Sequence, residues 1–390
     1  MNASDSARPE SRRAVVVLAR RSPFGRLAGA FRNLEAHDLL APVLAASARE
    51  SGVEPHEVDD VIIGNATGGG GNVARLAALT AGFPASVPGL TVDRQCASGL
   101  DAVVLACRLV EAGAGTWFLA GGVESCSTAP LRARRLTSAA GAPDFYARAR
   151  LAPDSHGDPD AGQAAENVAN RYGVDRASQD RYALQSHNRT AAARGAMAAE
   201  IVPVAGHSTD ETPRRNMTAA FLSRFMPAFD PVGSVTAGNS CADADGAVVI
   251  TVTTLEVARA RGFETVLEFA GSAAAGGETA LFGTAGAHAV GKLLPALRLE
   301  PADVSTWEFN EAFAAQVLAS AQLMQVGPQF LNRNGGALAY GHPYGASGAM
   351  LVANLLRQRA QSEYDDGWSV AAVSAAGGVG TAAAFRTVRL

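Results

Sequence analysis

Short runs of strand-forming residues alternate along the chain with longer alanine-rich segments, whose apolar residues recur at helical spacing. The short runs predict strands at 14–18, 58–63, 116–120, 247–252, 266–270, 307–309 and 369–373. Because strands that alternate with helices pack as sheets with helices on their faces, this order predicts a layered α/β architecture.

The stretch from 121 to 239 differs from the rest of the chain. Proline, arginine and aspartate are scattered through it, around one predicted helix at about 162–195. We interpret the stretch as an inserted lid or loop domain. Its basic residues make it a candidate surface for an anionic ligand. The alternative interpretation is a solvent-exposed loop region that binds no ligand.

A faint duplication relates the two ends of the chain. An Ala-Ser-Gly turn at 97–99 is followed by an apolar helix, a strand and a Gly-Gly pair, and the same series begins again at 346–348. Since repeated units usually stack into one core, we expect two similar α/β halves packed face to face, with Cys96 and His342 meeting at their junction. In a chain so rich in alanine, a chance match is the alternative.

The composition excludes several classes of protein. With 390 residues, of which 48% are hydrophobic, the chain can form two or three domains around a large core. A net charge of -4 supplies no basic field for nucleic acid. The four cysteines lack Cys-x-x-Cys spacing and are few for a disulfide framework, so we expect free thiols and no metal site.

No segment predicts export or membrane insertion. Residues 1–13 are charged and contain no apolar stretch, so we expect a flexible tail rather than a signal peptide. No apolar run approaches the roughly 18 residues of a membrane span. The expected location is the cytoplasm, with no membrane or nucleic-acid partner.

Two residues carry the candidate chemistry. Cys96 directly precedes an apolar helix, where the helix dipole and unpaired N–H groups favour thiolate, so we expect its pKa to lie below about 8.5. His342 lies in the glycine-dense sequence GHPYGASGA, which holds the imidazole through the backbone. A thiolate beside an imidazole can accept an acyl group, and N–H groups of a glycine turn can hold the oxyanion. Cys107, inside the same helix, is better interpreted as a small buried hydrophobe.

Several blocks, taken together, resemble the thiolases, the acyl-CoA C-acyltransferases, over nearly the whole chain from about residue 14. The nucleophile block, a substrate-side motif and the histidine block of that family match VDRQCASGL at 92–100, NEAF at 310–313 and GHPYGASGA at 341–349. The resemblance implies a thiolase-like layered α-β-α-β-α fold of two similar halves plus an inserted loop domain. The implied boundaries are 14–120 with 240–258 for the first half, 121–239 for the CoA-binding loop domain, and 259–390 for the second half.

The resemblance also implies a role for individual residues. Cys96 carries the acyl group of an acyl-CoA or 3-oxoacyl-CoA as a thioester, while His342 activates the thiol and, with a water held by Asn310, stabilises the enolate or oxyanion. Backbone N–H groups of Cys96 and Ala376 form a second oxyanion hole. Coenzyme A, a substrate rather than a permanent cofactor, would contact Arg214, Ala237, Cys241, Ala312 and Phe313. A homodimer or homotetramer is expected.

One departure from the family concerns the second step. Thiolases that make or break a C–C bond use a second cysteine as acid and base, and Ser374 takes its place here. A hydroxyl is a far weaker acid than a thiol and is poorly suited to proton transfer near neutral pH. The acyl-transfer half-reaction through Cys96 is unaffected by this change.

Further departures fall around the expected substrate site, so we expect a remodelled acyl pocket. His288 is a candidate for the missing base, although a lone histidine in a glycine-alanine segment is more often incidental. The other altered positions are Asp93 for asparagine, Asp160-Ala161 for a histidine-methionine pair, Cys241 for serine and Phe282 for methionine.

Three functions fit these residues. The first is a thiolase-type acyl-CoA C-acyltransferase, for thiolytic cleavage or Claisen condensation, in which His342, Ser374 or a water replaces the absent thiol. The second is decarboxylative condensation, as in the related ketosynthases, or acyl transfer to a heteroatom by Cys96, His342 and Asn310. The third is a thiolase-like subunit that binds acyl-CoA without catalysis. Retention of all three residues of the Cys-His-Asn set favours catalysis.

Overall fold

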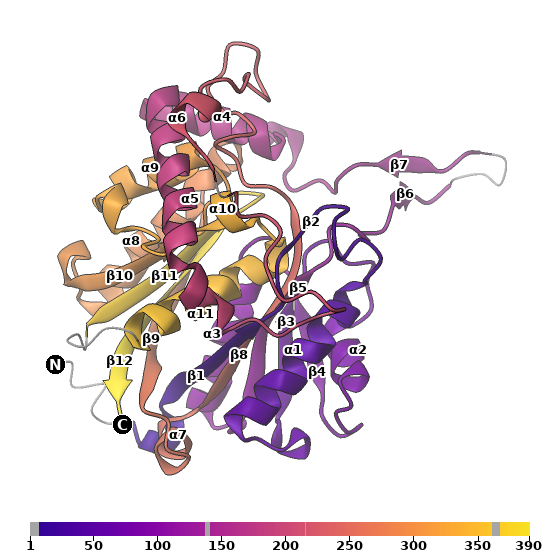
Figure 1. Cartoon of the computed structure of the whole chain (residues 1–390), viewed down its shortest axis with the longest axis vertical. Coiled ribbons are helices and arrows are strands. Elements are labelled where there is room, and N and C mark those ends of the chain that lie inside the picture. Colours follow the sequence, from indigo (N-terminus) through magenta and orange to yellow (C-terminus); the bar gives the residue numbers. More distant parts are fainter. Residues whose placement is uncertain (1–7, 137–140, 215, 361–366) are drawn as a thin grey trace.

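Ten strands of the computed structural model, which describes residues 8–136, 141–214, 216–360 and 367–390, form one hydrogen-bonded sheet system (Figure 1). Every run predicted as a strand is confirmed, whereas several further strands were missed. The path runs through β10 (Val304–Phe309), β11 (Trp368–Ala375), β12 (Val379–Arg389), β9 (Thr265–Gly276), β1 (Ala14–Arg21), β8 (Ala244–Thr254), β5 (Phe118–Glu124), β3 (Asp60–Gly64) and β4 (Gly89–Val92), and β2 (Gly25–Arg26) pairs with β8.

The two ends of this path have the same topology. In the first half, β3 pairs parallel with β5, β5 antiparallel with β8, and β8 antiparallel with β1. In the second half, β10, β11, β12 and β9 repeat that series of orientations. Within the sheet, and among the described residues, two residue pairs between β1 and β9 join the halves. The duplication predicted from the Ala-Ser-Gly echo is therefore present in the strand order.

Helices form three layers around the strands. α3 (Ser98–Ala112) and α11 (Tyr344–Ala360) pack against each other and against strands of both halves. α1 (Ala36–Ser51) and α2 (Val73–Thr80) cover the outer face of the first half, and α8 (Ala285–Leu297), with α9 (Ala314–Met324) packed on it, covers the outer face of the second. This arrangement confirms the layered α-β-α-β-α fold.

The two central helices touch through backbone. A Cβ atom on Gly99 would lie 2.4 Å from the carbonyl oxygen of Gly345, and one on Gly348 would lie 2.4 Å from the nitrogen of Leu100. Since real side chains do not approach so closely, only glycine permits the crossing. The glycines of the two echoed turns thus bring the N-terminal ends of α3 and α11 together, and with them the residues just before each helix.

The stretch between β5 and β8 lies largely outside the sheet. It contains a hairpin of β6 (Arg132–Arg134) and β7 (Asp144–Tyr146), which projects from the body in Figure 1, and the helices α4 (Ala161–Tyr172), α5 (Arg176–Ala198) and α6 (Ala219–Leu222). The single helix predicted at 162–195 is wrong. Gly173, with φ of 64°, ends α4, and the Asp175 side chain accepts the Ser178 N–H to begin α5.

The predicted flexible tail, residues 1–13, lies only partly within the described residues. Residues 1–7 lie outside the described part of the chain. A short 3-10 helix spans Glu10–Arg12, and the Arg13 guanidinium donates to both carboxylate oxygens of Glu268 at 2.5 and 2.7 Å. The prediction is therefore wrong for residues 10–13. Within the described ranges, no helix is both long and apolar enough to cross a membrane.

Candidate active site

A tight turn presents Cys96 just before α3. Gln95 has a φ of 50°, and the Asp93 carboxylate accepts its N–H at 2.7 Å. The Ser98 hydroxyl accepts the Arg94 N–H at 2.8 Å and donates to the Gln95 carbonyl at 2.6 Å. These local bonds stabilise a backbone conformation that a non-glycine residue rarely adopts. Asp93, a departure from the family pattern, accordingly serves the turn that positions the thiol.

His342 faces Cys96 from the opposite half of the molecule. Gly341 has a φ of 90°, and the His342 N–H donates to the Ala242 carbonyl at 2.8 Å. The imidazole Nε2 lies 3.2 Å from Cys96 Sγ, and Nδ1 lies 2.6 Å from Ser347 Oγ. The Tyr344 ring packs edge-on against the imidazole, with centroids 5.1 Å apart. The structure therefore brings Cys96 and His342 together, as the duplication predicted.

Burial keeps both members of this pair neutral. Loss of solvent raises the pKa of the Cys96 thiol to about 12, although the backbone N–H groups of Ala376 and Cys96 oppose the shift. Loss of solvent also lowers the pKa of His342 to about 4. The prediction that the helix N-terminus lowers the pKa of Cys96 is wrong for the free protein, because desolvation of the thiolate outweighs the favourable N–H groups.

Asn310 follows β10 and is almost completely buried, with 2% of its surface exposed. Its backbone N–H donates to Ala372, and its backbone carbonyl accepts from Gln316 Nε2. Its side-chain Nδ2 has no hydrogen-bond partner among the described residues. A buried amide without a partner is costly, so Nδ2 is suited to a water or a substrate oxygen.

Glu311 is structural, a role that the sequence analysis did not assign. Its buried carboxylate accepts hydrogen bonds from Tyr182, Ser186, Asn332 and the Leu338 N–H. Two of these donors belong to α5, so the carboxylate fixes that helix against the end of β10. Burial raises the pKa of Glu311, and the donors oppose that rise.

Ser374 lies near the end of β11 with both hydrogen-bonding functions of its hydroxyl in use. Oγ donates to the Gly283 carbonyl at 2.7 Å and accepts the Gly286 N–H at 2.8 Å. The hydroxyl is therefore held against the segment that leads into α8. His288, the other candidate base, is exposed on α8 and lies 3.5 Å from the Thr284 hydroxyl. Neither residue has a hydrogen bond to Cys96 or His342 among those of the described residues.

The turn that follows Ser374 brings backbone to the thiol. Gly377 and Gly378 have φ values of 86° and 79°, which turn the chain so that the Ala376 N–H reaches Cys96. Leu151 packs over this turn, since a Cβ on Gly377 would meet its carbonyl oxygen at 3.4 Å. The two N–H groups named as an oxyanion hole therefore lie beside the same sulfur.

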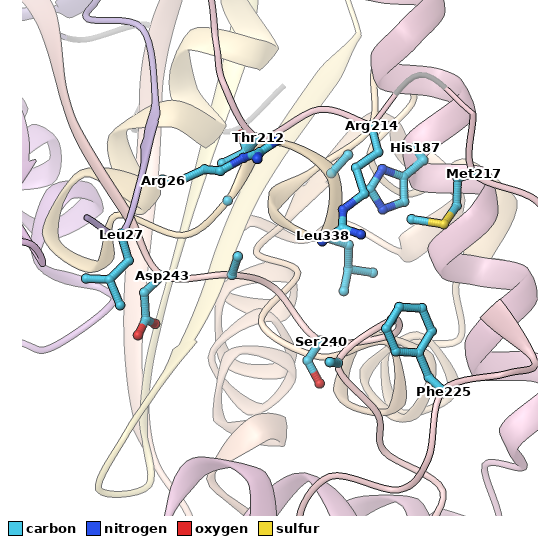
Figure 2. A pocket seen from close by; sticks show the side chains of 15 residues that line it. Arg26, Leu27, His187, Thr212, Arg214, Met217, Phe225, Ser240, Asp243 and Leu338 are labelled. Carbon is cyan, nitrogen blue, oxygen red and sulfur yellow. The ribbon is translucent and has the colours of Figure 1, made fainter. Parts of the chain in front are cut away.

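A cavity of about 320 Å³ opens beside the His342 turn (Figure 2). Two of the residues predicted to contact coenzyme A, Arg214 and Ala237, line it, and Gly341 forms part of its wall. Arg214 lies next to His187 in Figure 2. Burial, and then the Arg214 guanidinium, lower the pKa of His187 to about 4, and its Nδ1 has no partner among the described residues.

The other predicted contacts lie on the segments that border this cavity. Cys241 is flanked by two lining residues, Ser240 and Ala242, and its N–H donates to the Ala312 carbonyl at 2.9 Å. Phe313 pairs through its backbone with Ser240, and its ring packs edge-on against Phe229. The predicted residues are thus gathered at one place, although they come from distant parts of the sequence.

Two further positions that the sequence analysis assigned to the acyl pocket, 160 and 282, lie at the start of α4 and in the turn before α8. Asp160 is exposed at the start of α4 and pairs with Arg148 at 2.6 Å. Phe282 is half-buried in the 3-10 turn Thr279–Thr284. The remodelled acyl pocket stays a prediction.

Three contributors to the site escaped sequence reasoning. Ser347 was noticed only as part of an echoed turn, yet its spacing of five residues from His342 places its hydroxyl on Nδ1. His187 lies within the helix α5, and Arg26 is the last residue of the short strand β2, so neither shows a local signal of its position on the cavity.

Comparisons with known proteins relate nearly the whole chain to one family. The profile of the thiolase N-terminal domain matches residues 14–256, and that of the thiolase C-terminal domain matches residues 263–387. The chain is 43% identical over 379 residues to YhfS of Bacillus subtilis and 40% identical over 380 residues to VraB of Staphylococcus aureus, strain MRSA252; both are named provisionally as acetyl-CoA C-acetyltransferases. These matches cover 96% and 95% of this chain and 99% and 98% of the relatives. The crystal structure of the Bacillus anthracis acetyl-CoA acetyltransferase superposes with a TM-score of 0.88 at 32% identity, covering 97% of this chain and 99% of that one. The two profiles span most of the chain, and the relatives and the superposed structure match nearly all of it, so the chain belongs to the thiolase family of acyltransferases.

Proposed function

We propose that this protein transfers acyl groups between CoA thioesters through a thioester on Cys96, as an acetyl-CoA C-acetyltransferase of thiolase type. The observation that carries the proposal is the 3.2 Å approach of His342 Nε2 to Cys96 Sγ beside a cavity that Arg214 lines. The names of the relatives support acetyl as the acyl group.

Proton transfer from Cys96 to His342 begins the reaction. For Nε2 to accept the proton, Nδ1 must carry hydrogen and donate it to Ser347 Oγ, which lies 2.6 Å away. Because burial disfavours the separated charges, ionisation coincides with attack on the thioester carbonyl instead of preceding it. The site thus favours the thiolate only when a carbonyl is ready to receive the negative charge.

Negative charge then passes to the carbonyl oxygen of the acyl group. The N–H groups of Cys96 and Ala376, which approach the sulfur, are placed to donate to this oxyanion. When the tetrahedral intermediate collapses, coenzyme A leaves as a thiol with the proton that His342 held, and the acyl group remains on Cys96. Asn310 Nδ2, buried without a protein partner, is available to a water or carbonyl oxygen in the second half-reaction.

The cavity fits the anionic part of coenzyme A. Arg214 and Arg26 line it together with a neutral His187, and guanidinium groups suit phosphate oxygens. The expectation that the loop domain supplies an anion-binding surface becomes part of this proposal, with Arg214 against the nucleotide. The domain boundaries and the homodimer or homotetramer inferred from the family remain predictions, as does the cytoplasmic location.

A second candidate function follows from Ser374. Since its hydroxyl is held by Gly283 and Gly286, it is poorly placed to move a proton on the substrate. Decarboxylative condensation creates the carbanion by loss of carbon dioxide, and acyl transfer to a heteroatom needs no carbanion. Cys96, His342 and Asn310 suffice for either reaction.

Two assays separate the candidates. The protein is first incubated with acetyl-CoA, and the acetyl adduct is located by peptide mass spectrometry; Cys96→Ala should abolish it, and Cys107→Ala, in the buried face of the same helix, should keep it. Cleavage of acetoacetyl-CoA by free coenzyme A is then followed through the loss of its enolate absorbance. If Cys96 is acetylated and acetoacetyl-CoA is cleaved, the proposal is supported. If Cys96 is acetylated but acetoacetyl-CoA is not cleaved, the second candidate is supported. With no adduct from any CoA thioester, the protein would be a binding subunit.

A further inference from the structure

Cleavage of a 3-oxoacyl-CoA leaves a carbanion that must be protonated, so the thiolase reaction proposed above needs an acid near Cys96. His342 is committed to Cys96 and Ser347 through its two ring nitrogens. Ser374 is committed to Gly283 and Gly286. The acid must therefore be sought elsewhere in the same crevice.

Cys241 is held between the two turns that form the crevice. Its N–H donates to the Ala312 carbonyl in the turn that begins at Asn310, and the neighbouring Ala242 carbonyl accepts the His342 N–H. Isolated β-bridges join Ser240 to Phe313 and Asp243 to His342, so the segment is hydrogen-bonded on both sides of Cys241. Cys241 is thus positioned as firmly as the histidine, by the same short stretch of chain.

The Cys241 thiol shares the environment of the Cys96 thiol. Both are partly exposed and pack against one buried cluster that includes Tyr340 and Ala346. Burial, then Asp243, then Cys96 raise the pKa of Cys241 well above its usual range. Cys241 therefore carries its proton at neutral pH and can act as an acid.

The remaining thiols are less well placed. Cys107 is fully buried in α3. Cys126 follows β5 and is not part of the segment that bonds to the turns of Asn310 and His342. Burial, and then the carboxylates of Glu124, Asp243 and Asp245, raise the pKa of its thiol. Cys241 lies between two residues that line the cavity, Ser240 and Ala242, and its backbone is bonded to the turn that carries the unpartnered Asn310 Nδ2.

We propose that Cys241 is the acid and base of the carbon–carbon step, in place of the cysteine that Ser374 replaces; this rests on the thiolase-type function proposed above. The Cys96 thiolate adds to the 3-oxo carbon, and the bond between C2 and C3 breaks. The electron pair stays on C2 as the enolate of acetyl-CoA, which takes the proton of Cys241. Incoming coenzyme A then gives its thiol proton to the Cys241 thiolate and attacks the acyl group, which regenerates the Cys96 thiolate. Condensation runs through the same steps in reverse.

The test uses Cys241→Ser and Cys241→Ala in the full chain. Serine keeps the size and hydrogen bonding of the position but not the acidity of a thiol, so a role limited to contacting the substrate would survive it. We expect both variants to form the acetyl adduct on Cys96 at a rate within about threefold of the parent. Because acid–base catalysis contributes about 100-fold or more, we expect thiolysis of acetoacetyl-CoA to fall by at least that factor, with KM little changed.

A second assay measures the proton transfer to and from the α-carbon by itself. When the acetyl-enzyme is given acetyl-CoA in D₂O, the α-carbon of acetyl-CoA should acquire deuterium with the parent and not with either variant. Cys126→Ser, the same change at another partly exposed thiol, should behave as the parent in every assay. Unchanged thiolysis or exchange in Cys241→Ser would overturn the proposal, and so would an equal loss of thiolysis and adduct formation. Absence of the adduct in the parent would instead overturn the proposed function.

Discussion

Removing the Ser347 hydroxyl tests whether His342 acts as the base for Cys96. The hydroxyl lies 2.6 Å from Nδ1 and is the only side-chain hydrogen bond to that nitrogen among the described residues. In Ser347→Ala, the Nδ1 proton of the buried imidazolium loses its acceptor. An unsatisfied buried donor costs about 1–3 kcal/mol. At about 1.4 kcal/mol per factor of ten, acylation of Cys96 should slow by about 5- to 150-fold.

The assay is a single turnover of acetyl-CoA, quenched at set times and read as the acetylated fraction of Cys96. Affinity for coenzyme A should not change, because Ser347 does not line the cavity. Ser51→Ala is the matched control: that serine is equally buried at 4% exposure and also makes a 2.6 Å hydrogen bond, to the Ser47 carbonyl in α1. Acylation by Ser347→Ala within twofold of this control would refute the role given to His342.

Three further predictions concern packing, ligand binding and pH. Gly348→Ala places a Cβ 2.4 Å from the Leu100 nitrogen and should lower the free energy of unfolding, measured in guanidinium titrations, by about 3 kcal/mol. Gly291→Ala is the control: this exposed position in α8 has open space around it, so the change should be neutral or stabilising. Arg214→Ala should weaken coenzyme A binding by about tenfold in calorimetry and leave binding of a pantetheine thioester unchanged, so equal weakening of both would contradict the phosphate contact. Burial raises the pKa of Glu308 to about 8, so between about pH 4.5 and 8 the folded protein retains a proton that the unfolded chain releases, and the contribution of Glu308 to stability falls as pH rises. Glu308→Gln should flatten the dependence of Tm on pH across that range, and an unaltered slope would contradict the assignment.

Much of the fold could be predicted from short stretches of the sequence. The strand-forming runs and the two Ala-Ser-Gly turns were enough to predict layered halves and the meeting of Cys96 with His342, because strand propensity and glycine turns act over a few residues. The break between α4 and α5 was also encoded locally, by Gly173 and Asp175, and was overlooked. β12 escaped because Gly380 and three consecutive alanines interrupt its strand-forming residues, and pairing with β9 and β11 decides its conformation.

For the chemistry of the site, too, some features follow from the sequence and others only from the tertiary structure. Sequence alone determined which groups are present: a cysteine before a helix, a histidine in a glycine turn, and a serine at position 374. Tertiary structure decided their states, because a pKa and a hydrogen bond depend on atoms that are distant along the chain. It buried Cys96 and His342 so that both are neutral, and it committed Ser374 to the segment before α8. Solvent exclusion and the choice of partners are properties of the packed molecule, and no local pattern of residues specifies them.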